Sequence, residues 1–379
     1  MKKIIVIAVV LTAMLVYLQC TNNKSSNSQV PAYAGTDKCQ ACHQKEFELF
    51  KSSDHFHAMD TVSASTVLGN FNNSQFIYQG DTAFFYTNNS RYFVKTTDST
   101  GRKKEFELSY TFGWRPLQQY LVKFDDGRIQ VLPFCWDTRD KSKGGQRWFH
   151  LYNKEKISHT DELFWMGMNQ NWNYMCADCH TTDFKKNFNL SQNSFASQWH
   201  ESRVSCESCH GPASNHIAWA NDKNPGYPYK GFEISLAAKA MNWRIDPAKQ
   251  TNIPDQVIKH DTLIEMCARC HARATRFTDE YQHGQSFLQS HIPALLDTQN
   301  YFIDGQIKEE DYEYGSFLQS KMYAKGVTCI HCHEPHSMKS ISQGNNLCSS
   351  CHQPAKYDGP QHSHHAITST GNHCISRHI

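Results

Sequence analysis

The chain has 379 residues, of which 15 are Cys and 22 are His, and its length suits one large domain or two modest ones. Its net charge of +2 is small, and its mean hydropathy of −0.63 indicates no unusual excess of core material. We do not expect nucleic-acid binding, because that function needs a concentrated basic surface.

The N-terminus has the pattern of an export signal. Two lysines precede an apolar run at 4–18, which is short for a membrane span and typical of a signal peptide. Cys20 follows that run, and a polar Ser/Asn-rich tether continues to residue 34. We interpret 1–20 as a lipoprotein-type signal peptide, 21–34 as a flexible tether, and a lipid on Cys20 as the contact with the membrane. Cleavage elsewhere and an uncleaved anchor stay open, because the residues before Cys20 are not small. Each alternative gives an extracytoplasmic protein.

The stretch between residues 44 and 175 contains alternation typical of strands. Apolar and polar residues alternate in five segments separated by Gly-, Asn- or Asp-containing turns, at 75–79, 83–87, 91–96, 104–112 and 128–134. This pattern predicts a small antiparallel β insertion at 75–136. We expect its many aromatic residues to form a core rather than a cofactor site.

Twelve cysteines form six copies of one pentapeptide, Cys-x-x-Cys-His. Two thiols at this spacing can bond to the two vinyl groups of a haem, and the next imidazole can bind the iron. The intervening residues vary among the copies, so we predict that they hardly matter. The sequence therefore predicts six covalent haems c in an electron-transport protein. The predicted haem-binding residues are Cys39, Cys42, His43, Cys176, Cys179, His180, Cys206, Cys209, His210, Cys267, Cys270, His271, Cys329, Cys332, His333, Cys348, Cys351 and His352.

Chance, zinc and disulfides each account for the motifs less well than haem does. Chance would give about 0.03 such motifs at this Cys and His content. Structural zinc would pair Cys-x-x-Cys units to reach four ligands, but it gives no reason for a His directly after every second Cys. Disulfides are plausible in an exported protein, yet they do not account for the His either.

Three cysteines lie outside the motifs, namely Cys20 and two others. Cys135 stands in an apolar stretch and is predicted to be a buried free thiol. Cys374 resembles the start of a seventh motif, but Arg377 stands where the second Cys belongs and His378 follows it. We do not expect a seventh haem there, and the simpler interpretation is a frayed tail.

The many remaining histidines point to a second axial ligand for most irons. Bis-His ligation keeps iron low-spin and suits electron transfer. His216 and His336, which follow motifs closely, are the strongest candidates, and His55 or His57 is the next. We also expect one of His362, His364 and His365 to bind iron and select His365. The others are expected to be ordinary exposed or hydrogen-bonded side chains, namely His150, His159, His200, His260, His283 and His291.

The spacing of the motifs predicts the architecture. Residues 35–379 are interpreted as one multihaem cytochrome c domain, with a five-haem cluster at 170–355. We expect a mostly α-helical and irregular body packed on the haems themselves, with aromatic side chains against the porphyrins, plus the β insertion. Propionates would make the holoprotein roughly six charges more acidic than its sequence, which favours a basic or mixed redox partner.

Several segments resemble the multihaem cytochrome c superfamily, which includes the tetrahaem acceptor of hydroxylamine oxidation, the hydroxylamine oxidoreductases and the pentahaem nitrite reductases. The resemblance is carried by Cys-Glu-Ser-Cys-His-Gly-Pro at 206–212 with His216, and by Cys-His-Glu-Pro-His at 332–336. It implies clustered haems in stacked and perpendicular pairs, with His216 and His336 as distal ligands.

A narrower resemblance concerns a bacterial subgroup that often continues into tetratricopeptide repeats. It is carried by the segments at 144–152, 170–180 and 312–329, and the similarity extends from about residue 35 to 374. The chain departs from the subgroup at Arg377 and stops at residue 379, which argues against a seventh haem and against partner binding through repeats. The alternative that this chain is a truncated or frameshifted product stays open.

Three functions fit the sequence. The favoured one is an electron carrier between respiratory redox partner proteins, with all six haems six-coordinate. The second is an oxidoreductase that acts on a small nitrogen or sulfur compound at one open haem. Basic or hydrogen-donating residues near the motifs that could serve it are Arg203, Arg269, Arg273, Lys185, Tyr174 and His200. An Arg near a haem more often pairs with a propionate. The third is a subunit of a larger complex that docks through the β insertion.

Overall fold

The computed structural model describes residues 30–378 apart from four short segments, 223–225, 237–242, 256–261 and 310. Cys20 with its predicted lipid, and His260, therefore lie outside the described residues. Within the described part of the chain, no helix combines the length and the apolarity needed to span a bilayer.

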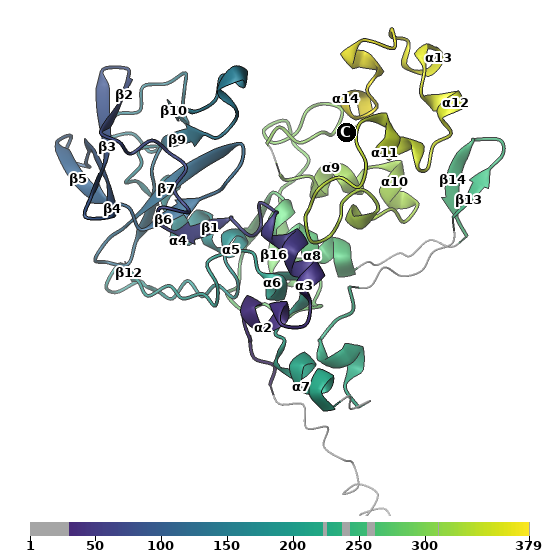
Figure 1. Ribbon diagram of the computed structural model, residues 1–379, viewed down its shortest axis with the longest axis horizontal. Coiled ribbons are helices and arrows are strands. Elements are labelled where there is room, and N and C mark those ends of the chain that lie inside the picture. Colours follow the sequence, from purple (N-terminus) through teal and green to yellow (C-terminus); the bar gives the residue numbers. More distant parts are fainter. Residues whose placement is uncertain (1–29, 223–225, 237–242, 256–261, 310, 379) are drawn as a thin grey trace, which may run out of the picture.

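Two antiparallel sheets occupy most of residues 59–150 and lie together at one side of the molecule (Figure 1). One sheet has four strands in the order β2-β3-β4-β5, and the other has six, in the order β1-β6-β7-β9-β10 with β8 paired to β7. Their bounds are β1 (Met59–Thr61), β2 (Ser74–Tyr78), β3 (Asp81–Asn88), β4 (Arg91–Thr97), β5 (Lys103–Glu107), β6 (Tyr110–Phe112), β7 (Leu117–Lys123), β8 (Ile129–Val131), β9 (Phe134–Asp137) and β10 (Arg147–His150).

Aromatic side chains from both sheets form the main core. Phe85 of β3 is fully buried, and its ring stacks on Trp148 of β10 with the centroids 3.8 Å apart. Val94 of β4 and Tyr120 of β7 belong to the same cluster. The alternation of side chains along each strand puts every second residue on this shared face. The predicted role of these aromatics, a core, agrees with their positions.

The central strand β7 has apolar residues on both faces. Tyr120 and Val122 point into the aromatic core, whereas Leu121 joins a second cluster on the opposite face, with Met59 of β1 and Trp172. Trp172 begins α4, which runs directly into the Cys176 motif. The six-stranded sheet therefore carries the second motif on the face opposite the four-stranded sheet.

The remaining chain consists of short helices and strand pairs. The longest helix among the described residues is α8, with 10 residues. The helices are α2 (Thr36–Gln40), α3 (Gln44–Lys51), α4 (Trp172–Met175), α5 (Ala177–His180), α6 (Cys206–His210), α7 (Ser214–Asp222), α8 (Thr262–His271), α9 (Tyr314–Leu318), α10 (Lys321–Ala324), α11 (Asn345–Ser349), α12 (Pro354–Tyr357), α13 (Pro360–Ser363) and α14 (Ile375–His378). The strand pairs are β11 (Phe188–Asn189) with β12 (Ser194–Phe195), β13 (Trp243–Asp246) with β14 (Thr251–Pro254), and β15 (Ala274–Arg276) with β16 (His291–Pro293).

The prediction of a mostly α-helical body is wrong. Helices account for 27% of the described residues and strands for 24%, the latter in several antiparallel sheets. The physical reason is that each motif needs only one turn of helix to place its His, so nothing in the chemistry extends the helices further.

Candidate haem-binding site

Each described motif forms about one helical turn. The N–H of His43 donates to the carbonyl of Cys39 at 2.9 Å, and His333 and His352 donate to the first Cys of their own motifs at the same distance. A hydrogen bond between residues four apart places the first Cys and the His on one face of the turn. The thiol and the imidazole of a motif can therefore bind to the same cofactor.

The motifs lie next to one another although they are far apart in sequence. Figure 1 shows α2 beside α6 and α5 beside α8 near the centre of the molecule, and these helix pairs are in contact. Thiols of different motifs approach closely enough to hydrogen-bond. These pairs are Cys39 with Cys206, Cys179 with Cys270, and Cys267 with Cys329. Motifs 1 and 3, 2 and 4, and 4 and 5 are thus neighbours.

Three motif histidines each face a histidine from another part of the chain. Two metal–imidazole bonds of about 2 Å, together with about 1 Å from each nitrogen to its ring centre, sum to roughly 6 Å between rings on opposite sides of one metal. The pairs match this spacing, with ring centroids 6.0 Å apart for His43 and His216, 6.0 Å for His55 and His271, and 6.5 Å for His210 and His336.

The second ring nitrogen of several histidines is occupied as a metal ligand requires. A ligating His usually donates its other N–H to a carbonyl or carboxylate, which fixes the tautomer and leaves Nε2 for the metal. Nδ1 lies 3.2 Å from the Ala58 carbonyl in His180, 2.8 Å from the Asp311 carbonyl in His271, 3.0 Å from the Met338 carbonyl in His333, and 2.8 Å from the Lys230 carbonyl in His216. This donor chemistry fits haem iron.

Burial keeps two of these histidines neutral. It lowers the pKa of His210 to about 4, with smaller contributions from His336, His216 and His43. Burial, followed by His271 and His180, lowers the pKa of His55 to about 4. A neutral imidazole is the form that binds a metal.

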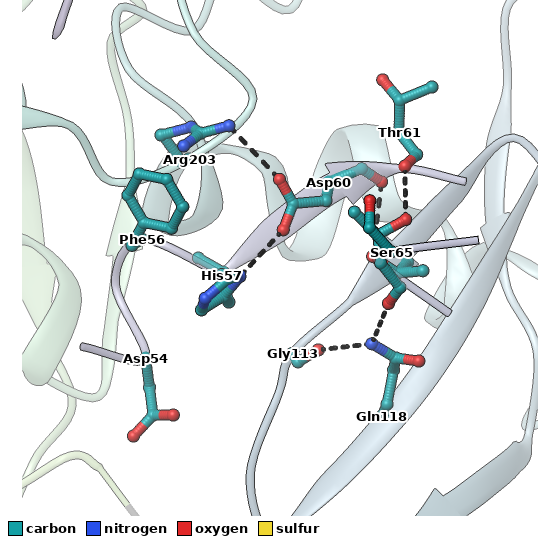
Figure 2. A network of polar contacts seen from close by, with 12 residues as sticks. Asp54, Phe56, His57, Asp60, Thr61, Ser65, Gly113, Gln118 and Arg203 are labelled. Carbon is teal, nitrogen blue, oxygen red and sulfur yellow. Dashed lines mark hydrogen bonds and ion pairs between the residues drawn. The ribbon is translucent and has the colours of Figure 1, made fainter. Parts of the chain in front are cut away.

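His55 and His57 have different surroundings. His55 faces His271, whereas the ring of His57 stacks on Trp114 with the centroids 4.1 Å apart. Figure 2 shows Asp60 between His57 and Arg203, with Nδ1 of His57 3.2 Å and the Arg203 guanidinium 3.3 Å from its carboxylate. Of this predicted pair, the structure brings only His55 to a motif.

The C-terminal histidines lie around the sixth motif. His362 packs edge-on against Tyr357, which in turn packs edge-on against His352, with 5.2 Å between the centroids in each case. His365 lies directly against Gly371, where an added Cβ would come within 2.7 Å of its ring. Among the described ring contacts, the selected residue His365 is not paired with a motif histidine.

Cys374, the start of the possible seventh site, lies against the sixth motif. Its thiol is next to that of Cys348, and its backbone N–H donates to the Asn345 side chain at 2.9 Å. The side chain of His378 lies outside what the structure describes.

Intervening residues of three motifs make specific contacts that sequence reasoning missed. Glu207 is 0% exposed, and its carboxylate accepts the N–H groups of Ala34, Gly35 and Ala213, each at 2.8 Å. Asp178 forms an ion pair with Arg276 and lies near His291, and Arg269 donates to the Ser208 carbonyl at 3.3 Å. That the intervening residues hardly matter for haem attachment stays a prediction, while these contacts give three of them a role in packing. The signal in the sequence was a charged residue inside the motif.

A disulfide needs two bonded cysteines, and a structural zinc site needs four ligands close together. The described cysteines are all free. In the same part of the chain no group of three or more His, Cys, Asp or Glu is placed to hold a metal ion, whereas structural zinc takes four such ligands.

Comparison with known proteins gives one partial family match. The family described as cytochrome c554 and c-prime matches residues 38–78 and 136–211, which contain the first three motifs. The match supports a multihaem c-type cytochrome. It also supports covalently bound haem c, electron transport and an extracytoplasmic location.

One solved structure, the crystal structure of the outer cell wall cytochrome OcwA, is similar at 16% identity with a TM-score of 0.47. The match covers 82% of this chain and 58% of that chain, so this chain spans less than two thirds of OcwA. No curated protein matches the sequence significantly.

Proposed function

We propose that this protein carries electrons through six covalently bound haems c, most of them ligated by two histidines. The observation that carries the proposal is the set of three imidazole pairs, each joining a motif histidine to a distant one at about the spacing of a six-coordinate iron. Two histidine ligands leave little to rearrange on reduction, which suits transfer rather than catalysis.

We assign the distal ligands from these pairs. His216 completes the haem at His43, His55 the haem at His271, and His336 the haem at His210. Each of the three links joins parts of the chain that are distant in sequence, so ligation also ties the domain together.

The contacts between motifs support a continuous path for electrons. Motif 1 contacts motif 3 through Cys39, motif 3 approaches motif 4 through Cys209, and motif 5 approaches motif 6 through Cys332. The contacts of motif 4 with motifs 2 and 5 complete the array. Haems held at these neighbouring motifs would pass electrons from one to the next.

The proposed setting is the outer side of a membrane. A lipid on Cys20 would hold the protein there, and the tether would end at Ala34 and Gly35, where Glu207 fixes the chain to motif 3. Redox proteins of a respiratory chain, with basic or mixed surfaces, are the proposed partners.

The test is electron paramagnetic resonance of the oxidised protein, matured in a haem-attaching host and checked for six haems by mass. Replacing His55, His216 or His336 by Ala should each convert one low-spin haem to high-spin while the haem count stays at six. His57→Ala is the matched control for His55→Ala and should leave every haem low-spin. The assignment fails if His57→Ala produces the high-spin signal and His55→Ala does not. Colourless matured protein would end the proposal altogether.

One observation favours the alternative, an oxidoreductase with an open haem. Among the described ring contacts, His180 packs on Phe112, with the centroids 4.4 Å apart, and the imidazoles of His55 and His271 lie farther from it. A haem at His180 could therefore keep one axial position for a small nitrogen or sulfur compound. A high-spin signal in the wild type that responds to nitrite, hydroxylamine or cyanide would favour this alternative; uniformly low-spin, unresponsive haems would exclude it.

A further inference from the structure

Two buried donors between motifs 3 and 4 lack a partner in the structure. They are Nε of Arg269 and Nδ1 of His283. His283 is 8% exposed, and it packs against Gly211, the residue after the third motif, where an added Cβ would come within 3.0 Å of its ring. Leaving a buried donor unpaired costs about 1–3 kcal/mol, and more for a charged group. Two such donors together indicate a missing acceptor.

Two tyrosines complete this cluster of donors. The guanidinium of Arg269 lies 3.6 Å from the ring centre of Tyr281, and the two side chains are also hydrogen-bonded. The Tyr33 hydroxyl lies 3.4 Å from Nε2 of His283. Burial, followed by Arg269 and His210, lowers the pKa of His283 to about 3, so its ring is neutral and carries one N–H. With Tyr33 at Nε2, that N–H can occupy the unpartnered Nδ1.

The positive charge of Arg269 is not neutralised by a dedicated carboxylate. After the Cys270 thiol, the acid that acts most on Arg269 is Asp178, whose carboxylate is already engaged by Arg276 and His291. The carboxylate of Glu207 already accepts hydrogen bonds from three backbone N–H groups. A buried cation needs an anion near it, because the desolvation of an unpaired charge is costly. The missing acceptor is therefore an oxyanion.

We propose that Arg269, His283 and Tyr281 bind a propionate carboxylate of a haem. The inference rests on the proposed function, since six haems bring twelve such carboxylates into the protein. The cluster lies among motif residues, with Arg269 between Cys267 and Cys270 and bonded to Ser208 of motif 3. Propionates lie on the edge of a haem opposite its vinyl groups. Arg269 would therefore bind the propionate of a haem that is attached to another motif.

The test compares Arg269→Gln with Arg91→Gln in matured protein. Arg91 lies on β4 of the four-stranded sheet, is 60% exposed and is paired with Glu107, so it is the matched control. Removing a positive charge beside a haem favours the ferric state. We expect the reduction equilibrium of one haem to fall about tenfold in Arg269→Gln, which is 59 mV for one electron. Arg269→Lys should restore part of the shift, and Arg91→Gln should cause none. No shift in Arg269→Gln would overturn the proposal.

Further measurements separate the proposal from its alternatives. His283→Gln and Tyr281→Phe do not change the charge of the site. Each should shift the reduction potential of the same haem by less than Arg269→Gln does, and should create no new high-spin haem. A new high-spin signal in His283→Gln would make His283 an iron ligand instead. Nitrite or phosphate added to the wild type should leave the potential of this haem unchanged. A shift with either anion that Arg269→Gln abolishes would show a site for free anions. Wild type lacking covalent haem would refute the proposed function itself, whereas six haems without these shifts would refute only the present inference.

Discussion

The buried carboxylate of Glu207 should control how firmly the N-terminal segment is held. Its Oε1 accepts the N–H groups of Ala34 and Ala213, and its Oε2 accepts that of Gly35. In Glu207→Gln the amide oxygen can still accept two of these three hydrogen bonds, but it is a neutral acceptor. The new NH₂ group is itself a donor, so it cannot accept the third hydrogen bond. A hydrogen bond to a charged group contributes about 1.5–3 kcal/mol, and roughly half of that when neutral. At the lower end of these values the loss is about 3 kcal/mol, or roughly a hundredfold in local opening.

Native-state hydrogen exchange measures this opening directly. The amides of Ala34, Gly35 and Ala213 should exchange about a hundredfold faster in Glu207→Gln than in the wild type. Glu155→Gln is the control, because Glu155 is exposed. Protection that changes less than about threefold would refute the reasoning, since the carboxylate would then not hold these three amides.

Three other predictions concern the β-sheets. Phe85→Ala should lower the free energy of unfolding by about 3–5 kcal/mol in denaturant titrations, whereas Phe84→Ala, at a position 42% exposed, should change it by about 0.5 kcal/mol or less. Cys135 is 0% exposed, and burial raises its pKa to about 12; because the thiolate is the reactive form, iodoacetamide at pH 8 should modify it only in unfolded protein, as mass spectrometry would show. The hydrogen bond from Arg139 lowers the pKa of Asp137, so the stabilisation is present at neutral pH and is lost as the pH falls below the usual carboxyl range. Asp137→Asn should therefore destabilise the protein at pH 7 more than at pH 3, and equal effects would contradict this.

The sequence predicts the local chemistry better than the architecture. The six motifs and the strand alternation at β2, β3 and β4 can be recognised because they depend only on spacing along the chain. Strand β7 is missed, since Gln118 and Gln119 interrupt its apolar pattern. The structure buries both amides against hydrogen-bond partners, with Gln118 bonded to Leu68 and Tyr120.

The pairing of histidines is the part that spacing cannot provide. His216 follows motif 3 in sequence, yet it faces His43 of motif 1, and His336 follows motif 5 but faces His210 of motif 3. Closeness in sequence identified these candidates without identifying their partners. Those depend on how α2, α6 and the later loops pack, and no local pattern encodes that packing.

The proposed ligation of one haem by His43 and His216 has a consequence for biogenesis. An exported polypeptide emerges N-terminus first, so Cys39, Cys42 and His43 would reach the attachment machinery while the distal imidazole is still on the other side of the membrane. The earliest cofactor would then spend part of translocation with one axial position filled only by solvent. A nascent chain halted before His216 should bind carbon monoxide at that iron once reduced, and the mature protein should not.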